Sequence, residues 1–563
     1  MRRAILMFAA MGIMVIVASG VALAAAMGVG SAAKERCVGA PPCFATIQGA
    51  VDAAHAGDVI RIGPGTFAGG VTIDKSVNVI GSGASKTTIK GGGPVLTIGK
   101  AFAPREPKVT ISKVRITGGH TTSSPLSKEF VGKKNVIALG GGIAIPPGKF
   151  NKSEERFAAG ATVKVTESVI SGNRVGPSAT VPFGPPCPGG RDCPFAFAGG
   201  GGIDNWGALT LERTQVSDNL AAGVASDATG GGIDSDQGSL DLRYSTITSN
   251  RAIAGVPNGR YAEGGGIFTG SLLSGEAPVA VRVRGGSISD NEASLTSRLP
   301  YFVGDGKGST IDMNANGGGA HFVGGSSISI VNARIDENEV GVDDPKGEPY
   351  AFDSALHFSE RSTIDLSHSK IEDNEVRAKV GSSEHAGPSG SAIDINGPSR
   401  GGHGPQTVSH VRITGNTTLV TSEDGEAQAT GGAIYNGAAT RITHSVISGN
   451  RLTARSAHGS ASVLGGGILN DGARLMLQHN LIEDNHAIAT GPDGYAHGGG
   501  IWNGRLFLKQ PPHLTLSHTR VIGNTLRASP GLPVKGGGIF TAYPVALDHS
   551  RIAHNVPDQC FGC

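Results

Sequence analysis

The chain has 563 residues, with 48 Lys and Arg against 46 Asp and Glu, so its formal net charge is only +2. This balance gives no cationic field for nucleic acid, an anionic membrane or a polyanionic substrate, and we expect no nucleic-acid partner. Glycine supplies 89 residues, roughly twice its usual share, whereas aromatic residues make up 5%. Few large side chains favour a thin core repeated many times over a set of thick-cored globular domains.

The N-terminus has the pattern of an export signal. Arg2 and Arg3 precede an uncharged apolar run over residues 4–29, followed by small residues that suit cleavage. We therefore predict a signal peptide over residues 1–33 and a secreted or cell-surface location. The run is also long enough to span a bilayer, so an uncleaved anchor is the alternative and the one membrane contact that we expect.

The six cysteines fall into three close pairs. Their spacings are C-x5-C, C-x5-C and C-x2-C, and the residues are Cys37, Cys43, Cys187, Cys193, Cys560 and Cys563. In an exported protein this pattern predicts local disulfides, although six cysteines allow 15 connectivities. A structural zinc site would normally need two C-x2-C pairs or nearby histidines.

The segment after the signal differs from the rest of the chain. Residues 45–54 predict a short helix, and residues 57–81 contain short apolar strands separated by glycine and proline. We expect residues 34–118 to form an N-terminal cap and the first coils, because an uncovered first coil would expose bare strand edges.

Two interleaved motifs recur through the remaining chain. The first ends in Asn with Ile or Val three residues earlier, and its asparagines are Asn173, Asn219, Asn250, Asn291, Asn338, Asn374, Asn416, Asn450, Asn485, Asn524 and Asn555. The second is Gly-Gly-Gly-Ile or a variant, and Ser354-Ala355-Leu356 is its most degenerate copy. Alternating short strands between the motifs predict about three strands per unit. We predict an all-β, right-handed parallel β-helix of about 12 coils over residues 119–563, with variable spacing absorbed by loop insertions.

These residues also resemble a known group. Residues 46–81 are similar to the opening of pectin-lyase-like β-helix proteins, and the repeats from 140 to 555 resemble those of polymorphic outer-membrane proteins, with Ile or Val where those repeats usually have Phe. The resemblance implies the β-helix fold. It says little about activity, since this fold carries lyases, hydrolases and adhesins.

Enzyme motifs of that superfamily are mostly missing. The pectinesterase phrases do not occur. Asp343-Asp344 and Gly402-His403-Gly404 match fragments of the polygalacturonase pattern, but both fall in loop-like insertions and the third fragment, Asn-Thr-Asp, does not occur. Leu547-Asp548-His549-Ser550 faintly resembles a pectate-lyase phrase, in the last coil where a long substrate would have little groove.

One position per coil, directly after the inward Ile of the glycine motif, should face outward because side chains alternate along a strand. The row is Asp204, Asp234, Phe268, His321, His357, Asp394, Tyr435, Leu469, Trp502 and Phe540. Carboxylates about 5 to 9 Å apart can cleave a glycosidic bond as an acid/base pair, so the weak catalytic candidates are Asp204, Asp234, Asp236 and His357. Aromatic rings suit sugar faces, and the candidate ligand-binding residues are Asp394, Tyr435, Trp502 and Phe540. The alternative is an exposed row under no constraint.

A second column contains histidine. Six residues before the repeat Asn, the final six coils carry His368, His410, His444, His479, His518 and His549. We expect the imidazoles to form a structural ladder. Metal binding at His444, His479 and His518 is a weaker alternative, because no carboxylate recurs beside them. No metal or other cofactor is predicted, and calcium binding is left open.

The sequence therefore predicts a secreted or cell-surface monomer that binds polysaccharide or another surface along its long face without catalysis. One alternative is a polysaccharide lyase or glycoside hydrolase acting on an extracellular polysaccharide. Another is a structural spacer.

Overall fold

The computed structural model describes residues 33–124, 136–151, 153, 156–177, 196–223, 226–254, 261–270, 279–296, 313–344, 349–359, 361–380, 390–396 and 406–563. The predicted signal peptide, Cys187, Cys193 and Gly402-His403-Gly404 lie outside these residues, apart from Ala33. Residues 34–563 form one compact unit. In the described part of the chain, no helix is long and apolar enough to cross a membrane.

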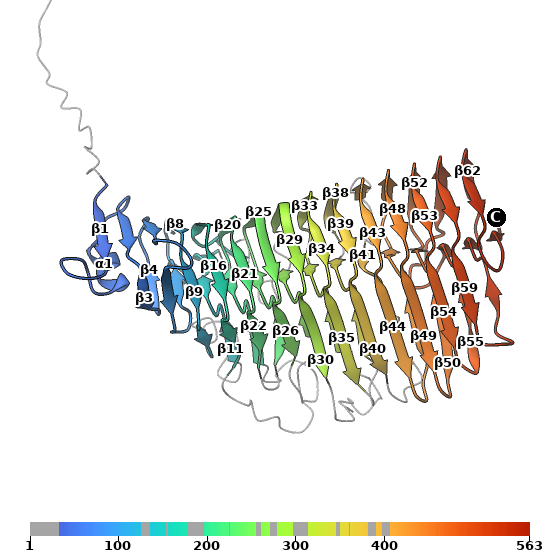
Figure 1. Ribbon diagram of the computed structural model, residues 1–563, viewed down its shortest axis with the longest axis horizontal. Coiled ribbons are helices and arrows are strands. Elements are labelled where there is room, and N and C mark those ends of the chain that lie inside the picture. The colour runs from blue at the N-terminus through green and yellow to red at the C-terminus, as the bar shows by residue number, and fades with distance from the viewer. Residues whose placement is uncertain are drawn as a thin grey trace, which may run out of the picture. The chain divides into compact units, whose positions relative to one another are not determined.

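A coil visits four sheets in turn, and successive coils stack beside one another along the chain (Figure 1). Between Ala208 and Thr248 the chain forms β20 (Ala208–Glu212) and β21 (Gln215–Ser217) in sheet I, β22 (Leu220–Ala222) in sheet II, β23 (Asp227–Thr229) in sheet III and β24 (Ile233–Ser235) in sheet IV, then returns to sheet I as β25 (Ser239–Thr248). Each strand pairs in parallel with its equivalent one coil later. The fold is therefore a parallel β-helix, as predicted.

The strands of each sheet are as follows. Besides β20, β21 and β25, sheet I contains β1 (Glu35–Val38), β2 (Val59–Ile62), β3 (Gly65–Ala68), β5 (Asn78–Ile80), β6 (Thr87–Lys90), β8 (Lys108–Ser112), β9 (Arg115–Thr117), β15 (Thr162–Thr166), β16 (Val169–Ser171), β29 (Ala280–Ser289), β33 (Ser327–Val331), β34 (Arg334–Asp336), β38 (Thr363–Ser367), β39 (Lys370–Glu372), β42 (Gln406–Ser409), β43 (Arg412–Thr414), β47 (Thr440–Thr443), β48 (Val446–Ser448), β52 (Arg474–Gln478), β53 (Leu481–Glu483), β57 (His513–Ser517), β58 (Arg520–Ile522), β62 (Val545–Asp548) and β63 (Arg551–Ala553). Besides β22, sheet II contains β10 (His120–Thr121), β17 (Arg174–Val175), β26 (Arg251–Ala254), β30 (Glu292–Thr296), β35 (Glu339–Asp344), β40 (Glu375–Val380), β44 (Thr417–Ser422), β49 (Arg451–Ser456), β54 (His486–Thr490) and β59 (Thr525–Ala528).

Sheet III has two parts. The first is β11 (Val136–Leu139), β18 (Ala196–Gly199), β23, β27 (Tyr261–Glu263), β31 (Met313–Asn316) and β36 (Pro349–Phe352), and the second is β45 (Ala427–Thr430), β50 (Ser460–Leu464), β55 (Asp493–His497) and β60 (Val534–Lys535). Besides β24, sheet IV contains β4 (Val71–Ile73), β7 (Leu96–Ile98), β12 (Ile143–Ile145), β19 (Ile203–Asn205), β28 (Ile267–Thr269), β32 (Ala320–Phe322), β37 (Leu356–Phe358), β41 (Ile393–Ile395), β46 (Ile434–Asn436), β51 (Ile468–Asp471), β56 (Ile501–Gly504), β61 (Ile539–Thr541) and β64 (Cys560–Phe561). A separate two-stranded ribbon pairs β13 (Phe150–Asn151) with β14 (Arg156–Phe157).

Sheets II and III are the main departure from the expected coil. The sequence pattern predicted about three strands per unit and assigned the extra length to loops. Instead, part of that length forms strands whose small side chains pack together in separate apolar clusters, such as Ala221 with Ala228 and Ala293 with Ala315. The interpretation missed them because alanine, which supplies most of the buried positions of these strands, carries a weak strand signal.

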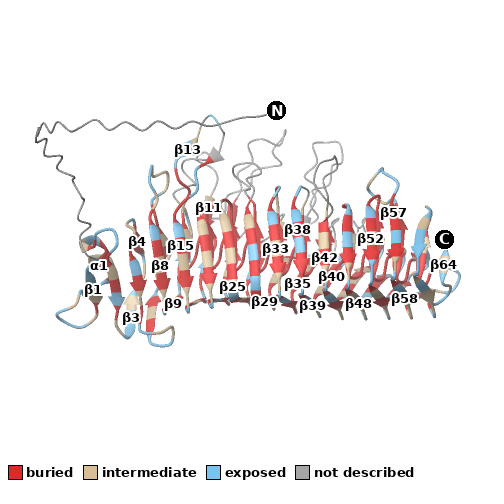
Figure 2. Cartoon of the chain, turned by 90° about the horizontal axis from the view of Figure 1, so that it is seen from above, coloured by how far each residue is buried: buried red, intermediate tan, exposed pale blue. Residues whose placement is uncertain are grey.

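The main core lies between sheets I and IV. The predicted apolar column before each repeat Asn is buried along the stack, with Ile170, Ile247 and Ile447 each 0% exposed, and the inward Ile of the glycine motif joins the same cluster. Figure 2 shows the buried positions continuing from coil to coil. The N-terminal end is covered by α1 (Ile47–Ala53), whose N-cap Thr46 accepts a hydrogen bond from the Gly49 amide, as the predicted cap requires.

The repeat asparagines form a continuous hydrogen-bonded ladder. From Asn173 to Asn524, each side-chain Nδ2 donates to Oδ1 of the asparagine in the next coil at 2.8 to 3.0 Å, and Asn555 is the last acceptor. Each Oδ1 also accepts a main-chain N–H of the coil before, as Asn450 does from Asn416. Buried polar groups need such partners, which explains why this position repeats as Asn.

The glycine motif marks the turn between sheets III and IV. Its first glycine adopts a left-handed conformation, as at Gly230 with φ 54°. At the second glycine the neighbouring backbone is close, because a Cβ on Gly466 would lie 2.4 Å from the Gly499 carbonyl oxygen. Both constraints favour glycine.

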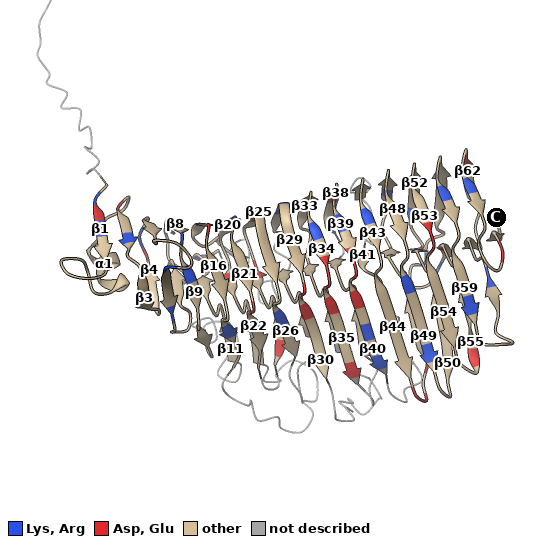
Figure 3. Ribbon diagram, in the orientation of Figure 1, with Lys and Arg blue, Asp and Glu red and all other residues tan. Residues whose placement is uncertain are grey.

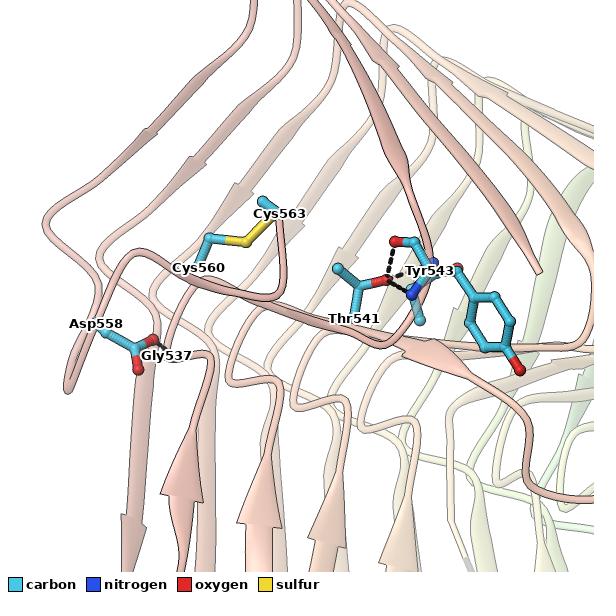
Figure 4. The surroundings of a disulfide bond; sticks show 7 residues. Gly537, Thr541, Tyr543, Asp558, Cys560 and Cys563 are labelled. Atoms are coloured by element: carbon cyan, nitrogen blue, oxygen red, sulfur yellow. Dashed lines mark hydrogen bonds between the residues drawn. A yellow bond between two sulfur atoms is a disulfide. The ribbon is translucent and has the colours of Figure 1, made fainter. Parts of the chain in front are cut away.

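The C-terminal coil is closed by β64 and a disulfide (Figure 4). Cys560 is bonded to Cys563 and Cys37 to Cys43, so two of the three predicted disulfides are present in the described residues. Asp558 accepts the main-chain N–H of Gly537 at 2.8 Å and anchors the final turn to the preceding coil.

Charges on the outer strands are mixed. Figure 3 shows acidic positions beginning β30, β35 and β40 in sheet II, with basic positions on nearby strands. Glu292, Glu339 and Glu375 are neighbours in register, and Arg251 and Arg377 pair with members of this column. This distribution agrees with the balanced composition.

Candidate functional site

The row predicted from the glycine motif exists as one column of sheet IV. Its members are register partners in adjacent strands, from Asp204 opposite Asp234 to Trp502 opposite Phe540. Because the preceding Ile points into the core, these side chains lie on the opposite face of the sheet. We call this column the sheet IV strip.

The strip is not exposed, contrary to expectation. Among the predicted site residues, the exposed fraction is 2% for Asp204, 0% for Asp234, 5% for Asp236, 8% for His357, 4% for Asp394 and 6% for Trp502. Tyr435 and Phe540 are half-buried. The physical reason is the unexpected sheet III, which contributes side chains that contact the strip, such as Thr229 to Asp234 and His497 to Phe540.

Three of the four catalytic candidates form an acidic cluster with Glu263 of β27. Burial raises the pKa of Asp204 and of Asp236, and the negative charge of Asp234 raises both further. Burial also raises the pKa of Asp234 to about 7, against the opposing hydrogen bond from Thr229. One oxygen each of Asp204 and Asp234 is buried with no hydrogen-bond partner among the described residues.

Glu263 of β27 extends this acidic cluster toward the following coils of the strip. Burial raises its pKa to about 7, although Asn316 donates a hydrogen bond to it at 3.3 Å. Its Oε2 lies 3.7 Å from Nδ1 of His321, the strip residue two rungs after Asp234. The acidic cluster therefore adjoins the histidines of the strip.

The fourth candidate, His357, belongs to a second cluster. Its Nδ1 lies 2.7 Å from Oδ2 of Asp353 and 3.5 Å from Oδ2 of Asp394. Burial raises the pKa of both carboxyls, and the Asp353 charge raises that of Asp394 further. Burial lowers the pKa of His357, opposed by Asp394, so the neutral imidazole is favoured.

Aromatic side chains dominate the C-terminal part of the strip. The Tyr435 hydroxyl donates to Oδ2 of Asp471 at 2.8 Å. Trp502 packs with Leu464 and Leu469. Beyond them, His497 stacks on Phe540 with ring centroids 4.3 Å apart and planes 4° apart, and Phe540 stacks on the exposed Phe561.

The histidine column forms a stacked ladder on the turn inside sheet I. Successive rings from His368 to His549 lie 4.8 to 5.0 Å apart. His444, His479 and His518 line an open surface pocket with Arg520. In-plane lone pairs of stacked, nearly parallel rings do not converge on one ion, so the ladder geometry favours the structural interpretation. Metal binding there stays an untested prediction.

Sequence reasoning missed Glu263, Asp353 and Asp471. Asp353 did leave a signal, because it stands where other coils have the first glycine of the motif. It keeps that left-handed conformation with φ 56°, which Asp tolerates better than most residues. Glu263 belongs to a sheet III strand, β27, whose approach to the strip no local pattern reveals. Asp471 lies on β51 two residues after Leu469 of the strip, so the alternation of side chains along a strand could have found it.

No protein-family model matches the sequence, and no curated protein sequence is similar to it. Among solved structures, the chain is similar to a mannuronic-acid-specific family 6 polysaccharide lyase from human gut microbiota, at 11% identity and a TM-score of 0.26 over 86% of each chain. It is also similar to the family 6 alginate lyase AlyGC, at 11% identity and a TM-score of 0.24 over 92% of this chain and 88% of the other. At these scores the comparison says nothing about the substrate or the reacting residues.

Proposed function

We propose that the protein is an exported glycoside hydrolase that cleaves an extracellular polysaccharide at the acidic cluster of the sheet IV strip. One observation carries the proposal: Asp204, Asp234 and Asp236 are buried together, and burial raises the pKa of all three, with the Asp234 charge raising the pKa of Asp204 and Asp236 further. Burying several carboxyls without cations destabilises a fold, and such groups concentrate at functional sites.

The cluster suits acid/base cleavage of a glycosidic bond. A carboxyl with a raised pKa keeps its proton near neutral pH and can protonate the leaving oxygen, while an ionised neighbour acts as base or nucleophile. Neighbouring rungs lie about 4.8 Å apart, near the lower end of the separation of about 5 to 9 Å used by such pairs.

The charge of the strip favours a neutral polysaccharide. Its ten positions contain carboxyls, imidazoles and apolar or aromatic groups, without Lys or Arg. A lyase acting on uronates must neutralise the substrate carboxylate, and a row of Asp opposes that. A polysaccharide lyase is therefore the weaker form of the cleavage hypothesis.

The half-buried Tyr435 and Phe540 lie five and eight coils beyond Asp234 along the strip, where their aromatic faces would hold more distant sugar rings of a long chain. Export is supported by the N-terminal pattern and by two disulfides, which persist in oxidising compartments. We also propose that the chain is related to the pectin-lyase-like β-helix proteins, which residues 46–81 resemble.

The second candidate function is polysaccharide binding without cleavage. The low exposure of Asp204, Asp234 and Asp236 favours it, since a reacting carboxyl must reach the glycosidic oxygen. Tyr435 and Phe540, at the C-terminal part of the strip, are only half-buried, so a sugar ring can reach them.

Incubating the protein with a panel of neutral and acidic polysaccharides tests cleavage. We expect new reducing ends from a neutral polysaccharide, lowered at least 100-fold by Asp234→Asn and unchanged by Asp365→Asn, an exposed carboxyl of β38. Unsaturated products absorbing near 235 nm would instead identify a lyase. No products with any polysaccharide, from a folded protein, would contradict the hydrolase.

Binding is measured separately, by retention in affinity electrophoresis. We expect Phe540→Ala and Tyr435→Ala to weaken retention, whereas Tyr244→Ala, an aromatic on sheet I with 67% exposure, should not. Retention by the wild type without cleavage, lost in the strip variants, would support the non-catalytic candidate. Equal retention by all four proteins would exclude the strip as a glycan surface.

A further inference from the structure

The cluster around His357 has a composition that the proposed hydrolysis does not use. Asp353, His357 and Asp394 each offer one ligand atom, and these atoms all lie within 4.8 Å of one another. The three side chains come from two consecutive coils: Asp353 lies just before β37, His357 lies on β37 four residues later, and Asp394 lies on β41 beside His357. All three are buried.

The charge of this cluster is uncompensated by protein groups. Among the described residues, neither Asp353 nor Asp394 forms an ion pair with Lys or Arg. Besides a hydrogen bond between the two carboxyls themselves, their partners are neutral: Ser391 donates to Asp353, Asn396 donates to Asp394, and Nδ1 of His357 lies 2.7 Å from Asp353. Two buried carboxylates without a cation are strongly disfavoured.

An unpartnered atom points to a missing ligand. Oδ1 of Asp394 is buried without a hydrogen-bond partner in the described structure, and the residue is only 4% exposed. The adjacent His321 ring lies T-shaped against His357 at 4.4 Å, but its Nδ1 lies 3.7 Å from Glu263 and its Nε2 forms a hydrogen bond with Ser359, so His321 does not supply the missing partner. Buried polar atoms normally have partners, so Oδ1 of Asp394 needs an explanation.

We propose that Asp353, His357 and Asp394 bind one divalent transition-metal ion, with Zn²⁺ as the best match. The ion's two positive charges neutralise both carboxylates while the imidazole stays neutral. Zinc takes nitrogen and carboxylate ligands at about 2.0 to 2.2 Å, so tetrahedral ligand atoms lie roughly 3.4 Å apart. The 3.5 Å between His357 Nδ1 and Asp394 Oδ2 already fits, and Asp353 Oδ2, at 2.7 Å from the same nitrogen, must withdraw by less than about 1 Å.

Calcium fits this cluster less well. It takes six to eight oxygen ligands, whereas one of the three groups here is an imidazole. The sequence did not decide whether the protein binds calcium. At this cluster we expect instead a metal that accepts a nitrogen ligand. The site is separate from the hydrolase proposal, since none of its ligands is assigned to the acidic cluster.

The test is metal retention by the full chain. Protein treated with EDTA is incubated with Zn²⁺, Mn²⁺ or Ca²⁺, dialysed, and analysed for bound metal and for the midpoint of thermal unfolding. We expect one Zn²⁺ per chain and a midpoint raised by at least 5 °C, with a smaller effect of Mn²⁺ and none of Ca²⁺. Failure of hydrolysis would leave this result unaffected.

Substitutions locate the ion. Asp394→Asn and His357→Gln should lower Zn²⁺ affinity at least 30-fold. Without metal, Asp394→Asn should unfold no earlier than the wild type, because it removes one of two repelling carboxyls; this keeps loss of binding distinct from loss of folding. Asp365→Asn, an exposed carboxyl nearby in sequence, should bind normally.

A second group of possible ligands provides the decisive control. His518, Asp548 and His549 form an exposed triad near the C-terminus. Zn²⁺ retained by Asp394→Asn but lost in His549→Asn would place the ion there and overturn the proposal. No retained metal and no midpoint shift in the wild type would also overturn it. So would an Asp394→Asn variant that is destabilised without metal, since that indicates a hydrogen-bonded network.

Discussion

At the scale of single residues, the structure separates two kinds of buried polar group. The ladder asparagines have partners in both neighbouring coils. The carboxyls of the sheet IV strip are equally buried, yet Asp204 and Asp234 each have an oxygen without a described partner. The first kind stabilises the fold, and the second kind is expected to weaken it and so requires a functional reason.

The raised carboxyl pKa values predict how stability depends on pH. Folding raises the pKa of Asp234 and of Glu263 to about 7, from 3.8 and 4.5. Between those pKa values the folded state holds more protons than the unfolded state. The contribution of these two carboxyls to the free energy of unfolding is therefore full below about pH 4 and is lost as the pH rises toward 7.

We therefore expect the free energy of unfolding, measured in denaturant with EDTA present, to be lower at pH 8 than at pH 5. Asp234→Asn should reduce this difference and stabilise the protein at pH 8, whereas Asp365→Asn should leave it unchanged. A wild-type stability that rises from pH 5 to pH 8 would show that other groups dominate.

At the scale of single elements, the asparagine ladder is expected to fix the turn between sheets I and II. In Asn450→Ala, the main-chain N–H and side-chain Nδ2 of Asn416 lose their shared acceptor. Leaving these donors buried should cost about 3 kcal/mol, measured by urea unfolding. Arg441→Ala, an exposed position on the adjacent β47, should change stability by less than about 0.5 kcal/mol; equal effects would mean that the ladder contributes little.

The glycine turn depends on space between coils. A Cβ at Gly466 would meet the Gly499 carbonyl oxygen at 2.4 Å, whereas a Cβ at Gly341 of β35 would meet only the Ser294 side chain at 3.7 Å. Gly466→Ala should therefore destabilise the protein by about 2 kcal/mol or more, and Gly341→Ala should be nearly neutral. Comparable unfolding midpoints for the two variants would contradict the close approach of the coils.

At the scale of residues 34–563, each coil is stabilised chiefly by its two neighbours, as in other solenoids. Ile447 is 0% exposed in the main core. Ile447→Asp would bury an unpaired charge at a cost of several kcal/mol, and protection of the adjoining coils should fall with it.

Hydrogen exchange measures that spread. We expect faster exchange in β43 and β53, the strands on either side of β48, with the effect fading toward α1. Val446→Asp is the matched control, because Val446 is the half-buried neighbour on the opposite face of the same strand. Unchanged protection around Ile447→Asp would show that the column is not interior.

The sequence by itself determined the repeat, the apolar column, the capping helix and the alignment of Asp204 through Phe540 in one row. Each of these depends on local alternation and on a motif that returns once per coil, and stacking converts such a motif into a column. The same reasoning located the disulfides Cys37–Cys43 and Cys560–Cys563, because their partners are close in sequence.

Only the tertiary structure decided whether that row is exposed. Alternation says that Asp234 points away from the core, but not that Thr229 and Glu263 arrive from sheet III to cover it. That sheet is built from weakly patterned segments, and its position depends on packing of Ala against Ala between sheets II and III. The raised pKa of Asp234 and the meeting of Asp353, His357 and Asp394 follow from this burial, which residues distant in sequence create together.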